Sequence, residues 1–74
     1  MNSGAAVYII DNIISGLPND KIIRISTQVV RDLIPMTVSI DWNTVIMTYV
    51  VKGWIVGKDV LASTGSNTIY VFYR

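Results

Sequence analysis

Four side chains between positions 21 and 31 are the strongest candidates for a chemical role in this sequence. If residues 21–33 form a helix, these side chains fall within about a quarter turn of one another, opposite the apolar residues. Lys and Arg on such a stripe can contact phosphates, and Gln can contact a base. The sequence therefore gives a hypothesis of nucleic-acid contact by Lys21, Arg24, Gln28 and Arg31.

The charge balance argues against that hypothesis. The net charge is only +1, whereas DNA-binding domains usually carry a pronounced basic excess. Asp20 and Asp32 flank the stripe and partly cancel it. A solvated helix face explains the same residues, and we prefer that interpretation. Because the helix pair is followed by a predicted β-hairpin, the layout resembles that of a winged helix, and nucleic-acid binding is kept as the alternative.

Aromatic residues in the second half of the chain form another group of candidates. A platform that stacks single-stranded nucleic acid would interleave them with Lys and Arg, but only Lys52, Lys58 and Arg74 are near. Large aromatic side chains are also common anchors of cores and interfaces. We therefore expect four of them to lie at an interface: Tyr49, Trp54, Tyr70 and Phe72.

Residues for catalysis or cofactor binding do not form a recognisable set. The chain has no His and no Cys, which removes the commonest general base and all thiol chemistry. The segment Gly53–Lys58 is one residue short of a phosphate-binding loop, and Asp59 stands where that loop needs Ser or Thr. We therefore predict a non-enzymatic protein without a catalytic, cofactor or metal site.

Composition indicates that part of the surface is not in water. Charged residues make up 15% of the 74 residues, against roughly 25% in an ordinary soluble domain, and mean hydropathy is +0.49. A domain of this size buries only about 60% of the surface of its unfolded chain, so it should need more charge, not less. We expect a single domain over residues 1–74 that forms a homo-oligomer.

The sequence offers little support for a membrane span or a targeting segment. The longest uncharged run, Val60–Tyr73, contains the turn signal STGSN, which is not typical of a lipid-facing helix. The N-terminus lacks the basic region of a signal peptide. We expect an intracellular or virion protein, and so short a chain would suit a viral, phage or mobile-element origin.

Hydrophobic periodicity changes at Pro35. The earlier residues predict helices over 5–16 and 21–33, with Gly16 ending the first. The later residues predict strands near 36–41, 44–51, 54–62 and 68–73, with Lys52-Gly53 as a hairpin turn. The expected fold is α+β, with two N-terminal amphipathic helices followed by a four-stranded antiparallel β-meander, in two layers.

The second and fourth predicted strands are apolar on both faces. In the fourth, Ile69, Val71 and Tyr73 alternate with Tyr70 and Phe72. Helices can cover only one face of the sheet, so the other should meet a second copy or a partner. We therefore expect a small structural or interaction protein that self-associates through its β-sheet.

Overall fold

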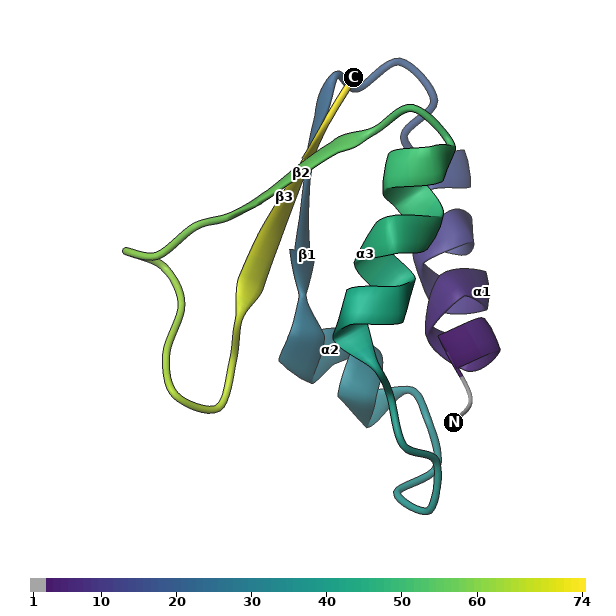
Figure 1. The fold of residues 1–74 in the computed structure, drawn as a ribbon, viewed down its shortest axis with the longest axis vertical. Coiled ribbons are helices and arrows are strands. Elements are labelled where there is room, and N and C mark those ends of the chain that lie inside the picture. The colour runs from purple at the N-terminus through teal and green to yellow at the C-terminus, as the bar shows by residue number, and fades with distance from the viewer. Residues whose placement is uncertain (1–2) are drawn as a thin grey trace.

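The computed structural model describes residues 3–74, which contain three helices and a three-stranded sheet (Figure 1). Helix α1 (Ser3–Ser15) is followed by strand β1 (Ile22–Ser26) and by helices α2 (Thr27–Asp32) and α3 (Trp42–Val51). Strands β2 (Ile55–Lys58) and β3 (Ile69–Tyr73) complete the chain. Each neighbouring pair of strands is antiparallel, in the order β1-β3-β2. The predicted α+β class is confirmed.

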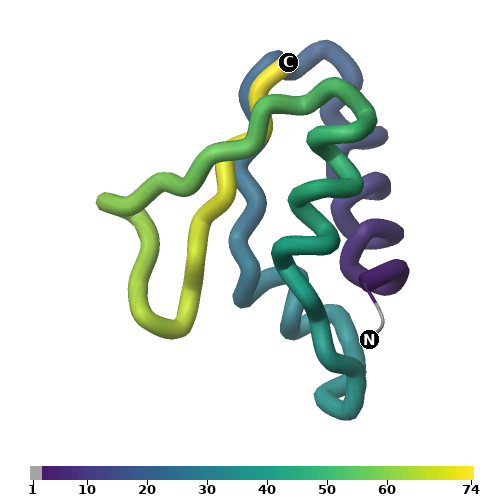
Figure 2. The backbone as a smooth tube through the Cα atoms, in the orientation of Figure 1, coloured from purple at the N-terminus to yellow at the C-terminus, as the bar shows by residue number. Residues whose placement is uncertain are grey.

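The last strand of the chain lies at the centre of the sheet. Strand β3 pairs with β1 on one side and β2 on the other, so the C-terminal residues join the two halves of the chain. Helices α1 and α3 lie side by side against one face of the sheet (Figure 1). The long loop between β2 and β3 extends away from α1 (Figure 2).

The core lies between that face and the helices. Ile23 and Phe72 are partners in the β1–β3 register, and both are buried. Phe72 contacts the rings of Tyr49 and Trp54 edge-on, with centroid distances of 5.1 and 6.0 Å, an arrangement that aromatic pairs favour. The remaining buried members of this core are Ala6, Ile10, Ile25, Val30, Ile34 and Val45.

The first predicted helix is confirmed, with its start moved to Ser3. Ala6 and Ile10 are four residues apart, so they share one face of α1, and both are fully buried. The amide of Gly16 donates to the carbonyl of Asn12 at 3.2 Å and ends the helix, as expected. The guanidinium of Arg74 donates to carbonyls of the following turn, those of Leu17, Pro18 and Asp20.

The second predicted helix is wrong over its first half. Residues 22–26 form β1, in which Ile23 and Ile25 are buried while Ile22 and Arg24 are exposed. This run of isoleucines fits a period of two as well as a helical period, and pairing with β3 selects the strand. Ser26 then begins α2 as its N-cap, because its hydroxyl accepts from the amide of Val29.

The four-stranded meander is also wrong. Residues 36–41 form turns and extended chain rather than a strand, and residues 42–51, predicted as a strand over 44–51, form α3. Asp41 caps this helix, since its carboxylate accepts from the amides of Asn43 and Thr44. Val45 and Tyr49 then face the core four residues apart. A strong cap and core packing outweigh the strand propensity of the β-branched residues.

The predicted hairpin turn at Lys52-Gly53 is instead the end of α3. Gly53 has a φ of 99°, the left-handed conformation that commonly stops a helix. The predicted strand over 54–62 is reduced to β2, whereas the one over 68–73 is confirmed as β3. No helix among residues 3–74 is long and apolar enough to cross a membrane.

Candidate interaction surface

The outer face of the sheet, turned away from the helices, carries a row of exposed apolar side chains. Ile22, Tyr73 and Ile55 are register partners across β1, β3 and β2, so they lie side by side on this face. Their exposed fractions are 57, 40 and 69%. This row is called the outer row below. It is an apolar part of the sheet that the helices do not cover, so it lies in solvent.

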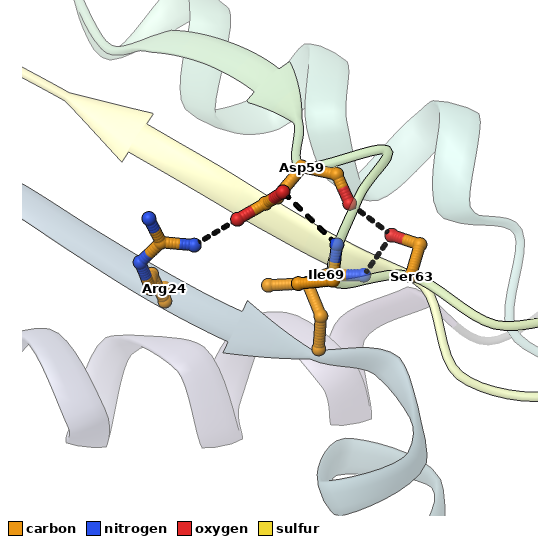
Figure 3. Close-up of polar contacts among 5 residues, drawn as sticks. Arg24, Asp59, Ser63 and Ile69 are labelled. Carbon is orange, nitrogen blue, oxygen red and sulfur yellow. Dashed lines mark hydrogen bonds and ion pairs between the residues drawn. The ribbon is translucent and has the colours of Figure 1, made fainter.

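A second row on the same face has an exposed arginine at one end, a buried valine at its centre and a glycine at the other end. Arg24, Val71 and Gly57 are register partners, and Val71 is buried although it points away from the core cluster. The guanidinium of Arg24 forms an ion pair with Asp59, just beyond β2 (Figure 3). Because β3 lies between β1 and β2, the Arg24 side chain crosses β3 and covers Val71.

The ion pair makes this part of the outer face electrically neutral. The hydrogen bond from Arg24, together with one from the amide of Ala62, holds the pKa of the Asp59 carboxyl below its usual range. Asp59 is therefore ionised at neutral pH and compensates the charge of Arg24. An apolar row beside a neutralised ion pair is better suited to contact with another protein surface than to the binding of a polyanion such as nucleic acid.

Asp59 and Ser63 also hold the start of the β2–β3 loop in place (Figure 3). The Ser63 hydroxyl donates to the carbonyl of Asp59 at 2.6 Å and accepts from the amide of Ile69 at 2.9 Å. Between these anchors, Leu61 is 99% exposed and Val60 is 74% exposed. The loop thus presents two apolar side chains beyond an ordered base.

Helix α3 has an exposed face with a shallow apolar hollow of about 450 Å³, lined by Thr44, Met47, Thr48, Val51 and Lys52. The ammonium group of Lys52 lies 3.6 Å from the carboxylate of Asp11 in α1 and 5.2 Å from the centre of the Tyr49 ring. The one cation of this hollow is thus already compensated.

The Tyr49 hydroxyl joins the two long helices beneath that hollow. It lies 2.8 Å from the carboxylate of Asp11 and 3.0 Å from the carbonyl of Val7, both in α1. Burial, followed by the hydrogen bond to Asp11 and the charge of its carboxylate, raises the pKa of the Tyr49 phenol. The phenol therefore stays a protonated donor and acts as a structural link.

The four residues proposed for nucleic-acid contact do not form a helical stripe. Lys21 precedes β1, Arg24 lies in β1, and Gln28 and Arg31 lie in α2. The Gln28 amide donates to Asp32 within α2, and the Arg31 guanidinium donates to the carbonyl of Val38 at 2.8 Å. Arg31 thus braces the connection between α2 and α3.

The aromatic residues expected at an interface pack within the protomer. Tyr49, Trp54 and Phe72 belong to the buried core, and Tyr70 is half-buried and stacks on Trp42 with a centroid distance of 5.6 Å. The sequence patterns did not identify the exposed residues of the outer row. The alternation in IYVFY does, however, place Tyr73 and Phe72 on opposite faces of the strand.

Acidic side chains in the described part of the chain, residues 3–74, form no group of three or more that could hold a metal ion. Comparison of the sequence and structure with protein-family models, with curated proteins and with solved structures gives no match.

Proposed function

We propose that this protein is a small non-enzymatic interaction protein that self-associates through the outer face of its sheet. The observation that carries the proposal is the outer row, in which Ile22, Tyr73 and Ile55 lie exposed across all three strands. Fully burying one large aliphatic side chain stabilises an association by about 1.5–3 kcal/mol, so a row repeated on two copies is a substantial contribution.

The charge pattern favours a second copy as the partner. The face carries one cation and one anion, Arg24 and Asp59, already paired. A two-fold related copy presents the same neutral pattern, so no net charge has to be buried without compensation. A partner with a strong net charge would gain little from this surface.

Sedimentation velocity over a range of concentrations tests the proposal. The wild type is expected to associate, and Ile22→Ser with Ile55→Ser is expected to weaken association by at least tenfold in dissociation constant, because the apolar contact is lost. Val51→Ser is the matched control, since it removes a similarly exposed aliphatic side chain from α3. A wild type that stays monomeric at high micromolar concentration would overturn the proposal.

A second candidate function is the binding of double-stranded nucleic acid through α3 and the β2–β3 loop. The order α1-β1-α2-α3-β2-β3 resembles that of a winged helix, in which the helix after the turn enters the major groove and the loop lies beside it. The connection between α2 and α3, residues 33–41, is longer than the usual turn of 3–4 residues. The resemblance is one of fold, which does not by itself imply function.

A gel-shift titration across salt concentration separates the two candidates. If the protein binds duplex DNA, affinity falls steeply with salt, and Lys58→Ala reduces the slope because it removes one phosphate contact. Lys21→Ala, on the turn before β1, is the control and should leave the slope unchanged. The absence of any salt-dependent shift removes this candidate.

A further inference from the structure

We infer that two copies of this chain join by antiparallel pairing of their β2 strands, edge to edge, into one six-stranded sheet. This inference rests on the proposed self-association and adds to it a contact at the edge of the sheet, beside the contact through the outer face. Strand β2 is one edge of the sheet, because its other side pairs with β3. An edge strand carries backbone donors and acceptors that can pair with another strand.

The hydrogen bonds between β2 and β3 determine which backbone amides and carbonyls of β2 remain free. The amide of Asp59 donates to the carbonyl of Ile69 at 2.8 Å, so the residues at 55, 57 and 59 direct their backbone groups toward β3. Val56 and Lys58 therefore direct their amides and carbonyls outward, away from β3. These four groups are the unpaired edge.

The other edge of the sheet is less suited to pairing. By the same alternation, Ile22, Arg24 and Ser26 direct their backbone groups away from β3. The last of these residues, Ser26, already caps α2, so that edge cannot extend in this direction. In β2 the middle position is Gly57, whose missing side chain lets a second strand approach closely.

Charge and existing hydrogen bonds select one register. A two-fold axis at Lys58 would place two ammonium groups opposite each other, which is unfavourable. An axis at Val56 would require the amide of Trp54, which already donates to the carbonyl of Tyr49 at 3.0 Å. An axis at Gly57 pairs Val56 of each copy with Lys58 of the other and uses all four free groups.

This pairing also increases the surface area that the interface can bury, which is small for one sheet alone. A stable interface usually buries about 800 Å² per partner, roughly a sixth of the 4735 Å² surface of this chain. The face of three strands of four or five residues is small against that requirement. Joining two sheets brings two outer rows onto one continuous face, which doubles the apolar surface that the contact through the outer face can bury.

Amide hydrogen exchange measured by NMR on the full chain tests the inference. In the associated protein, the amides of Val56 and Lys58 are expected to exchange at least tenfold more slowly than in dilute monomer. The amide of Ser26, on the other edge and at the far end of β1 from the outer row, is the internal control and should exchange equally in both. Association without protection of Val56 and Lys58 overturns the edge pairing but leaves the proposed self-association intact.

A proline variant gives a second test that does not depend on exchange rates. Lys58→Pro removes an outward-facing donor at an exposed position of an edge strand, where proline is tolerated, and near-ultraviolet circular dichroism checks that the fold is retained. The expected result is a folded protein whose dissociation constant is at least tenfold weaker. A folded variant that associates as the wild type does would overturn the edge pairing, and a wild type that never associates would overturn both proposals.

Discussion

The two faces of the sheet are built from alternate residues of the same strands, yet their surroundings differ completely. Phe72 and Tyr73 are neighbours in β3, but Phe72 is 1% exposed and Tyr73 is 40% exposed. The inner face packs on α1 and α3, whereas the outer face has the Arg24–Asp59 ion pair as its cover. Apolar content alone therefore does not identify an interface, and the position of the helices decides which apolar residues stay available.

The largest expected effect contrasts the two neighbours directly. Phe72→Ala removes the ring that contacts Tyr49 and Trp54 and should lower the free energy of unfolding by about 3–5 kcal/mol. Such a loss is comparable to the whole stability expected of a domain of this size. Tyr73→Ala should leave the monomer folded and weaken association instead. Chemical denaturation at low protein concentration measures the free energy of unfolding of both variants. Equal losses of unfolding free energy would contradict the distinction between the faces.

This distinction also shows how far the sequence could lead. The α+β class, the first helix, the last strand and the stop at Gly16 follow from local patterns that the tertiary structure reinforces. The first half of the second predicted helix and the predicted strand over 44–51 are wrong because runs of isoleucine and valine fit both the helical and the strand period. Asp41, as an N-cap followed by Val45 and Tyr49, was the missed signal of α3.

The candidate surface could be predicted only in part. The excess of apolar residues indicated an uncovered face, but the predicted interface residues included Tyr49 and Phe72, which the core uses. With residues 44–51 taken as a strand, Tyr49 was placed in the sheet, and the helix α3 that packs against Phe72 was missing from the predicted fold. The residues that remain exposed, such as Ile22 and Ile55, become recognisable only when the register across β3 is known.

The next effect concerns the helix pair that covers the inner face. Tyr49→Phe keeps the buried ring but removes the hydroxyl that bonds to Asp11 and Val7, and it should cost roughly 1–2 kcal/mol of unfolding free energy. Because the pKa of Tyr49 is raised in the folded state, the wild type should also lose stability above about pH 10, where the unfolded phenol ionises.

The predicted pH dependence is tested by comparing the wild type with Tyr49→Phe, which serves as the control. Denaturation midpoints are measured at pH 8 and at pH 10.5 for both proteins. The wild type should lose more stability than Tyr49→Phe, since the variant has no phenol at this position to ionise in the unfolded state. The same loss in both proteins would show that Tyr49 does not carry the alkaline dependence.

A smaller effect is expected at the start of α3. Asp41→Ala removes the acceptor for the amides of Asn43 and Thr44 and should lower the free energy of unfolding by about 1 kcal/mol. Asp41→Asn keeps a capping oxygen and should recover most of the loss. If alanine and asparagine are equally destabilising, the cap is not what selects a helix over the strand predicted for this segment.

The smallest effect on the protomer concerns the cover of the outer face. The Arg24 side chain is 61% exposed, so its pair with Asp59 is screened by solvent and salt, and the contribution of the pair to folding is small. The pKa of Asp59 is lowered in the folded state, so its contribution is present above the ordinary Asp pKa and is lost as pH falls through the lowered value. Asp59→Asn should therefore lose slightly less stability on acidification than the wild type, most visibly at low salt.

The same variant has a larger consequence for association than for folding. Asn at position 59 can still accept from the amide of Ala62, but it leaves the guanidinium of Arg24 without a counter-ion beside the outer row. Burying that uncompensated charge against a second copy is unfavourable, so the dissociation constant should rise while the denaturation midpoint at pH 7 barely changes. Arg24→Gln with Asp59→Asn removes both charges and should restore association. If the double variant associates no better than the single one, charge neutrality is not what makes this face compatible with its own copy.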